Sequence, residues 1–331
     1  MTLQDDSGAL AAPLPPDADR RRLLTLAGAG ALAATLSTTL SACGGGGGGG
    51  GGDAGASPAA PSPAPVPAPP PAGAAVKRGL AYDLKDRADV AALAGGSVGW
   101  WVNWALQPDA AVGAEPLGAG AMTHVPMLWN FSFDTAQVVA ALKARPSVQS
   151  LLVLNEPNLT DQADVTPADA AAQWPRYEEV ARQTGVQLIG PSITWGTMPG
   201  YADPVVWMDA FIAAYRAAHG GRDPRIDALA FHWYDYGLGG QLDRLAKYGK
   251  PFWVTEMANW HAQNDGAQID SVAKQKAQMA EMVQLCESRA DVLRYAWFTG
   301  RWSPDPHFTS LFGRPGELTE VGRHYLALPK A

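Results

Sequence analysis

Apolar and polar residues follow a repeating pattern along the chain from about residue 76 onward. Each repeat has a short apolar run followed by a longer stretch in which apolar residues recur at helical spacing. A strand followed by a helix, repeated along the chain, is typical of βα units around a parallel sheet. The apolar runs predict eight strands, at Gly79–Tyr82, Val98–Asn103, Thr123–Leu128, Ser150–Asn155, Gln187–Ile193, Ala228–Trp233, Phe252–Thr255 and Leu293–Phe298.

The amphipathic stretches predict helices, and local residues mark where several of them begin and end. Asp134 and Thr166 can accept hydrogen bonds from the first N–H groups of a helix, and Pro167 suits a first turn. Gly185 and Gly220 lie just past helix ends. The predicted helices are Asp134–Ala144, Pro167–Gln183, Pro204–Ala218, Gln241–Tyr248, Gln268–Glu287 and Glu317–Leu326. Together, strands and helices predict a (β/α)8 TIM barrel, a fold whose catalytic residues lie at the carboxyl ends of strands.

The first 42 residues have the composition of an export signal. A basic run at Arg20–Arg22 precedes the uncharged segment Leu23–Ala42, and Leu-Ser-Ala-Cys ends at Cys43. This ending resembles a bacterial lipobox, in which the cysteine is acylated, and the paired arginines resemble a twin-arginine signal. We therefore expect a protein anchored to the bacterial cell envelope by a lipid on Cys43. A plain transmembrane span is the alternative, which the many Gly, Ser and Thr residues disfavour.

The rest of the chain divides into a tether and one domain. Residues 43–75 hold a glycine run and an Ala-Pro-Ser segment without apolar periodicity, which predicts a disordered linker. Residues 76–331 have roughly the 250-residue length of one barrel, so we assign them to a single catalytic domain, taken to be a monomer. Besides Cys43 the chain has one cysteine, Cys286, which we expect to be buried in a helix.

Charge and motif content exclude several classes of function. The net charge of −7 argues against a nucleic-acid partner, which requires clustered Lys and Arg. Metal-dependent hydrolysis on this fold uses His and carboxylate ligands at converging strand ends, commonly as His-x-His, whereas the six histidines here are scattered. No Gly-x-x-x-x-Gly-Lys phosphate loop precedes a helix. We therefore expect no metal, no nucleotide and no other cofactor.

Two glutamates follow predicted strands at positions where a carboxylate would face a cleft. Glu156 follows the fourth strand in LLVLNEPN, and Glu256 follows the seventh strand in PFWVTEMANW. Either motif alone is common in turns and at surfaces, but both strands would end at the same face of one barrel. A retaining glycosidase needs two carboxyl groups about 5–5.5 Å apart, one as nucleophile and the other as acid and then base. The pair therefore points to glycoside hydrolysis.

Aromatic residues favour a polysaccharide as the substrate. An indole offers a flat surface to the CH-rich face of a sugar and an N–H group to its hydroxyls. We expect Trp297 to be the platform beneath the sugar at the cleavage point, and Asn103, Trp104 and Trp129 to add substrate contacts. About half of the tryptophans should instead pack in the core. Those at or beyond strand ends are Trp101, Trp104, Trp129, Trp195, Trp233, Trp260, Trp297 and Trp302.

As an ordered set, these motifs resemble clan A glycoside hydrolases, and most closely family 128, the glycosyl hydrolase catalytic core proteins with β-1,3-glucanase members. The resemblance spans Lys77 to about Leu328. It implies that Glu156 is the acid/base and Glu256 the nucleophile. Asn158 and Met257 differ from the family pattern, in which Asp and Phe are common. The motifs are KRGLAY, WWVNW, VPMLW, VLNEPN, GPSITW, FHWYDY, FWVTEMA and YAWF.

The same resemblance assigns supporting roles. Asn155 would donate to the sugar 2-hydroxyl, a contact that strengthens in the transition state. Tyr234 would hydrogen-bond the nucleophile and keep Glu256 ionised, while His232 would orient the substrate or the glutamate pair. We therefore predict a retaining β-1,3-glucan hydrolase. Two alternatives remain, namely a clan A enzyme acting on mannan or xylan, and a carbohydrate-binding barrel without catalysis.

Overall fold

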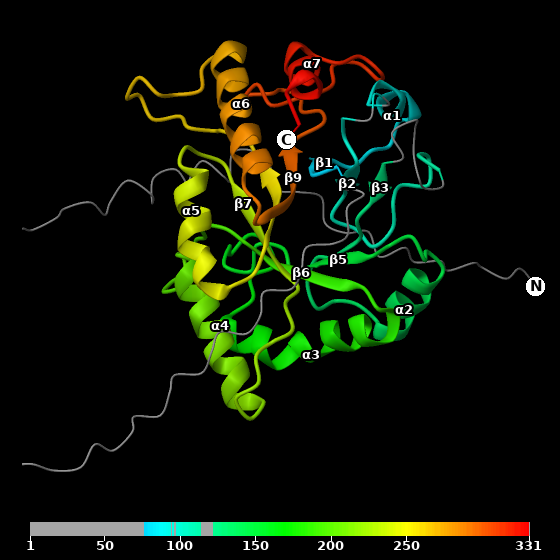
Figure 1. Ribbon diagram of the computed structural model, residues 1–331, viewed down its shortest axis with the longest axis vertical. Coiled ribbons are helices and arrows are strands. Elements are labelled where there is room, and N and C mark those ends of the chain that lie inside the picture. The colour runs from blue at the N-terminus through cyan, green and yellow to red at the C-terminus, as the bar shows by residue number, and fades with distance from the viewer. Residues whose placement is uncertain (1–75, 94, 96, 114–121, 331) are drawn as a thin grey trace, which may run out of the picture.

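A computed structural model of the chain describes residues 76–93, 95, 97–113 and 122–330 (Figure 1). The predicted export signal, the lipidation site Cys43 and the tether up to residue 75 lie outside the described residues. Within these described segments, no helix combines the length and apolar character needed to cross a membrane.

The described chain forms one parallel sheet that curls on itself, with helices packed around its outside (Figure 1). The order of the strands in the sheet is β3-β2-β1-β9-β8-β7-β6-β5-β4. Its strands are β1 (Arg78–Ala81), β2 (Trp100–Val102), β3 (Thr123–His124), β4 (Met127–Leu128), β5 (Ser150–Val153), β6 (Gln187–Ile193), β7 (Ala228–Trp233), β8 (Phe252–Met257) and β9 (Val292–Phe298).

The two outermost strands of this order, β3 and β4, are consecutive in the chain. Between them, the Val125 N–H donates to the Trp101 carbonyl at 2.9 Å, and the Leu152 N–H donates to the Pro126 carbonyl at 2.9 Å. The segment therefore bonds to the β2 side and the β5 side at once, and Pro126, which has no N–H, interrupts the ladder. β3 and β4 take the place of the predicted strand Thr123–Leu128. This confirms the parallel, TIM-like α/β architecture.

The helices begin where side chains satisfy their first N–H groups. Asp134 and Thr166 accept from Gln137 and Asp169 as predicted, whereas the sixth helix starts after Ser271, four residues later than expected for its first residue. The short first helix was not predicted. The helices are α1 (Arg87–Ala92), α2 (Thr135–Lys143), α3 (Pro167–Thr184), α4 (Pro204–Ala218), α5 (Leu238–Leu245), the 3₁₀ helix η2 (Ala246–Tyr248), α6 (Val272–Ser288) and α7 (Glu320–Ala327).

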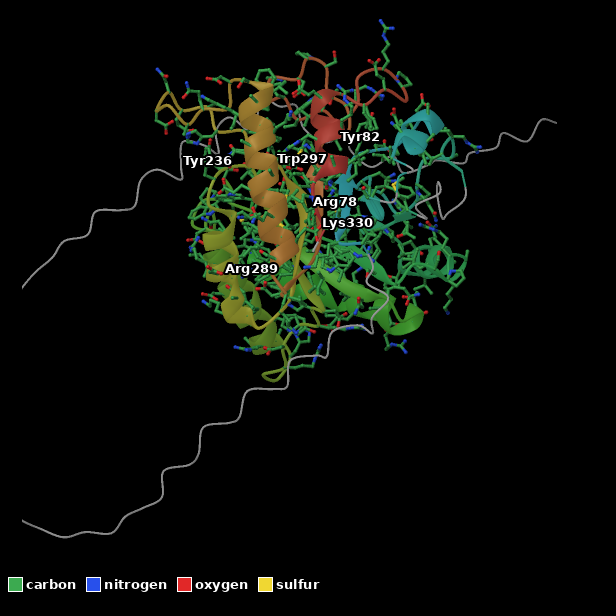
Figure 2. The ribbon with its side chains drawn as sticks, turned by 45° about the horizontal axis from the view of Figure 1, so that its top comes forward. Arg78, Tyr82, Tyr236, Arg289, Trp297 and Lys330 are labelled. Carbon is green, nitrogen blue, oxygen red and sulfur yellow. The ribbon has the colours of Figure 1, made fainter. Side chains whose placement is uncertain are left out.

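A buried arginine joins the first strand to the end of the chain. The Arg78 guanidinium donates to the carbonyls of Tyr325 at 2.7 Å, Leu328 at 3.0 Å and Pro329 at 2.8 Å, and its Nε donates to the Tyr295 hydroxyl at 2.9 Å. Since β1 also pairs with β9, these bonds fix α7 against the barrel (Figure 2 labels Arg78). Cys286 is fully buried in α6 as predicted, and burial raises the pKa of its thiol.

Candidate active site

Three titratable side chains meet at the carboxyl ends of β5, β7 and β8. Glu156 lies just beyond β5, His232 lies near the end of β7, and Glu256 lies near the end of β8. One ligand-capable atom of each side chain lies within 4.8 Å of the other two. The three residues are at most 1% exposed. The structure therefore brings together the two glutamates and the histidine that the sequence singled out.

The backbone of β8 explains how Glu256 comes to face His232. Phe231 pairs with Val254, but the next pair is His232 with Glu256, so Thr255 is an extra residue in β8. Such bulges re-aim side chains and are common beside active sites. Glu156 has a φ of +42°, and its N–H donates to the Ser192 carbonyl of β6 at 2.8 Å. A positive φ costs a glutamate about 1–3 kcal/mol, a strain typical of functional positions.

Two donors hold the carboxylate of Glu256. The Trp104 indole N–H donates to Oε1 at 2.8 Å, and the Tyr234 hydroxyl donates to Oε2. Donors to both oxygens fix the orientation of the carboxyl group. The Tyr234 contact is the one that the resemblance implied. Trp104, which was expected to touch the sugar, also contacts the predicted nucleophile.

His232 contacts both glutamates and the side chain of Thr255. Its Nδ1 lies 2.9 Å from Glu156 Oε1 and 3.5 Å from Glu256 Oε1, and its Nε2 lies 2.9 Å from the Thr255 hydroxyl. A hydroxyl can donate or accept, so Thr255 suits either tautomer of the neutral imidazole. Nδ1 can therefore donate to an ionised Glu156 or accept from a protonated one. Thr255 was not among the predicted site residues.

Asn155 and Trp129 flank Glu156. The Asn155 side chain donates to Gln162 Oε1 at 3.3 Å, while its buried Oδ1 has no hydrogen-bond partner among the described residues. The Asn155 backbone N–H donates to the carbonyl of Trp129 at 2.8 Å. Trp129 directly follows β4, and its side chain is half-buried. Both predicted residues therefore lie at the same strand ends as the acid/base candidate.

An aromatic wall stands beside Glu256. It consists of Trp104, Tyr234, Trp260, Phe298 and Trp302. The Phe298 ring lies 5.6–5.9 Å from each of the other four ring centroids, and Tyr234 stacks on Trp260 at 3.9 Å. Trp104 and Tyr234 belong to both the wall and the hydrogen bonds to Glu256. Phe298 was not predicted, because Trp297, the residue before it, was assigned as the aromatic platform of this strand.

The predicted platform at Trp297 is wrong. Its side chain is fully buried, and its indole N–H donates to the Thr309 carbonyl at 2.8 Å. The ring lies near Tyr325 of α7, at a centroid distance of 6.2 Å (Figure 2 labels Trp297). Successive residues of a strand point to opposite faces, so Phe298 faces the aromatic wall and Trp297 faces α7. The prediction was displaced by one residue.

Asn103 does not join the glutamates either. Its amide donates to the Gln107 carbonyl at 3.0 Å, and its Oδ1 accepts from the Ala105 N–H at 3.2 Å and lies 2.6 Å from His124 Nε2. Arg145 donates to the other ring nitrogen of His124 at 3.2 Å. Burial, and after it the charge of Arg145, lower the pKa of His124 to about 3. Asn103 therefore supports the loop after β2, and its predicted contact with substrate stays a prediction.

Known proteins share this architecture. Residues 79–325 match the glycosyl hydrolase catalytic core family. A family 128 (subgroup II) endo-β-1,3-glucanase from Pseudomonas viridiflava is 57% identical with a TM-score of 0.75, over 78% of this chain and 99% of that chain. A subgroup II enzyme from Sorangium cellulosum is 32% identical with a TM-score of 0.64, over 77% and 99%. A subgroup I enzyme from Amycolatopsis mediterranei, in complex with laminaritriose, is 26% identical with a TM-score of 0.57, over 76% and 99%.

A curated yeast protein is also related. The alkali-sensitive linkage protein 1 of Schizosaccharomyces pombe is 25% identical over 244 residues, which are 70% of this chain and 40% of that protein, so the chain spans well under half of its length. The family match and the similar solved structures identify the chain as a glycoside hydrolase. The chain belongs to the glycosyl hydrolase catalytic core family and, within it, to glycoside hydrolase family 128, as its motifs predicted.

Proposed function

We propose that the protein hydrolyses β-1,3-glucan with retention of configuration, using Glu256 as nucleophile and Glu156 as acid/base. The proposal is supported by the short distance between the two carboxyl groups. One oxygen of Glu156 lies within 4.8 Å of one oxygen of Glu256. Retaining glycosidases hold this pair about 5–5.5 Å apart, whereas inverting enzymes need roughly 6.5–9.5 Å to admit a water. The choice of β-1,3-glucan is supported by the similar endo-β-1,3-glucanases and their laminaritriose complex.

In the first step Glu256 attacks the anomeric carbon. Trp104 and Tyr234 hold its carboxylate in place for this attack. A new bond forms between a Glu256 oxygen and the sugar as the bond to the departing glycosidic oxygen breaks. Glu156 gives its proton to that oxygen, so the leaving sugar departs as a neutral alcohol.

In the second step Glu156 acts as a base. It takes a proton from water, whose oxygen attacks the anomeric carbon and releases Glu256. His232 stays bonded to Glu156 in both steps, because the Thr255 hydroxyl can pair with Nε2 whether or not that nitrogen is protonated. Asn155 would bind the 2-hydroxyl, and the aromatic wall would stack on the sugar held by Glu256.

Product analysis on four polysaccharides tests the proposed function. The purified protein is incubated with laminarin, lichenan, mannan and xylan, and reducing ends and product sizes are followed over time. We expect the fastest release on laminarin, as oligosaccharides of several lengths, since the similar subgroup II structures are endo-acting enzymes. Faster cleavage of mannan or xylan would contradict β-1,3-glucan as the substrate. Glucose as the sole product would contradict cleavage within the chain. Binding without hydrolysis would contradict the proposed enzymatic activity.

We also propose export and lipid anchoring through Cys43, supported by the lipobox-like ending of the signal segment. In a bacterial host the wild-type protein should lose residues 1–42, incorporate labelled palmitate and fractionate with membranes. The Cys43→Ala variant should do none of these. If that variant keeps its N-terminal segment and remains in the membrane fraction, a transmembrane anchor replaces the lipid.

A further inference from the structure

Glu156, His232 and Glu256 have the spacing of ligands around one small metal ion. His232 Nδ1 lies 2.9 Å from Glu156 Oε1 and 3.5 Å from Glu256 Oε1, and all three ligand atoms lie within 4.8 Å of one another. Two ligands bound tetrahedrally to Zn²⁺ at about 2.0–2.1 Å are roughly 3.4 Å apart. Small side-chain shifts would therefore place a single ion between the three donors.

The side chains that contact these donors can orient them as in a metal site. In the tautomer in which His232 Nε2–H donates to the Thr255 hydroxyl, the lone pair of Nδ1 faces both carboxylates. A ligating imidazole almost always donates its other N–H to an oxygen acceptor that fixes its orientation, and the Thr255 hydroxyl oxygen can serve as that acceptor. Trp104 and Tyr234 orient the third donor, the carboxylate of Glu256, in the same way.

Charge and burial also favour a cation here. Two carboxyl groups stand within 4.8 Å of each other with at most 1% exposure, where repulsion between them is weakly screened when both are ionised. A divalent ion would neutralise both. Three protein ligands with a fourth position left for water or substrate are typical of accessible zinc sites. One imidazole nitrogen with two carboxylates suits Zn²⁺ better than Mg²⁺ or Ca²⁺, which prefer oxygen ligands alone.

We propose that this cluster binds Zn²⁺, and that the bound ion is a reversible inhibitor competitive with the polysaccharide. The inhibition rests on the proposed glycosidase function, whereas the binding does not. The ion would occupy the space between the carboxyl groups that the anomeric carbon and the proton of Glu156 must enter. Sugar and ion therefore exclude each other, and the expectation that the enzyme needs no metal for turnover is unchanged.

Binding is measured first, so that the result does not depend on activity. Calorimetry with ZnCl₂ on the chelator-treated full chain should give one site, and Co²⁺ at the same site should show the visible absorption of tetrahedral coordination. Zinc binding should be lost in His232→Ala and Glu256→Gln. Thr255→Val should weaken zinc affinity about 10–100-fold, as is usual for a partner that orients a ligand, whereas Thr255→Ser should retain it.

A second histidine with two carboxylate partners provides the matched control. His261 lies 2.9 Å from Asp235 and 3.0 Å from Asp265, outside the catalytic cluster. His261→Ala should leave zinc affinity unchanged. The proposal is overturned if zinc affinity falls in His261→Ala while His232→Ala and Thr255→Val bind zinc like the wild type.

Rates on laminarin then separate the two proposals. Zinc should raise KM and leave kcat unchanged, a chelator should restore the rate, and Mg²⁺ should have no effect. Zinc binding through His232 without any glucan hydrolysis would refute the proposed function and leave the metal site standing. Hydrolysis that zinc does not inhibit, together with no His232-dependent binding, would refute the metal site alone.

Discussion

At the scale of single residues, Trp104 has a role that its aromatic character alone does not suggest. It follows β2 with a φ of +60°, and its indole N–H reaches Glu256 Oε1 at 2.8 Å. Trp104→Phe keeps a ring in the wall but removes this donor. A hydrogen bond to a charged group contributes about 1.5–3 kcal/mol, so kcat/KM on laminarin should fall roughly 10- to 100-fold.

The control for this variant is Trp207→Phe. The Trp207 indole N–H also makes one hydrogen bond, to the Val165 carbonyl at 3.1 Å, but α4 holds it on the outer layer of the fold. That variant should lose stability in urea denaturation and keep the kcat/KM of the wild type. A Trp104→Phe enzyme as active as Trp207→Phe would show that the indole donor does not act on the nucleophile.

His124 should make stability depend on pH. Its pKa is lowered from 6.5 to about 3, first by burial and then by Arg145. Because the folded-state pKa lies below the unfolded value, this stabilisation is complete above about pH 6.5 and is lost as the pH falls toward 3. From pH 7 to pH 4 the loss is about 3 kcal/mol. Urea denaturation at both pH values should show it in the wild type, and His124→Gln should lose correspondingly less. An equal loss in both proteins would exclude His124 as the cause.

The glutamates could be predicted from sequence, whereas the aromatic partners could be predicted only in part. A carboxylate directly after a buried apolar strand stands out, and parallel strands end at one face, so Glu156 and Glu256 were expected together. In the run Tyr-Ala-Trp-Phe, by contrast, either Trp297 or Phe298 could face the two glutamates. The choice between Trp297 and Phe298 depends on register, which shifts along β8 and β9 through bulges that the sequence does not mark.

At the scale of elements, Asn158 holds two loops of the site together. Its amide donates to the Thr194 carbonyl at 2.6 Å, with the carbonyls of Ala202 at 3.2 Å and Tyr201 at 3.4 Å also in reach. These bonds fix the loop after β5, which carries Glu156, to the loop between β6 and α4. Asn158→Asp, the residue common in the family pattern, would place a buried carboxylate against three carbonyl oxygens. We expect it to lower the free energy of unfolding by about 2–3 kcal/mol.

Asn130→Asp is the matched control. Asn130 Oδ1 accepts from the Ser132 N–H at 2.8 Å in the loop after β4, and an aspartate can accept the same bond. The change should therefore be nearly neutral in urea denaturation. If Asn158→Asp is as stable as Asn130→Asp, the amide does not hold the loops as described.

Helix positions were predictable where a capping side chain marks them. α2 and α3 begin directly after Asp134 and Thr166, because those side chains accept hydrogen bonds from N–H groups of the first turn. α5 begins at Leu238, three residues before the predicted start, after Gly237 with a φ of +78° and no side-chain cap. Without a capping residue, the first turn of that helix could not be located from the sequence.

At the scale of the whole molecule, the order of strands and helices was predictable because each βα unit has its own apolar period. The contacts between segments far apart in the sequence were not. The break between β3 and β4 depends on Pro126, and the bonds of Arg78 to the last residues join positions about 250 apart in the chain. Local patterns carry no information on such pairs, so the sequence predicts the arrangement of the sheet only through the general rules for connecting βα units.

The division of labour between the two glutamates is tested most directly by chemical rescue on an activated aryl β-glucoside of a laminari-oligosaccharide. In Glu256→Ala, azide can enter from the side of the missing nucleophile and should give the inverted α-glycosyl azide. In Glu156→Ala the glycosyl-enzyme still forms, because the activated leaving group needs no proton, and azide should then give the retained β-glycosyl azide. Both variants should lose several orders of magnitude on laminarin itself. Proton NMR of the anomeric centre decides between the outcomes. An α product from Glu156→Ala, a β product from Glu256→Ala, or near-wild-type laminarin hydrolysis by either variant would contradict the assignment.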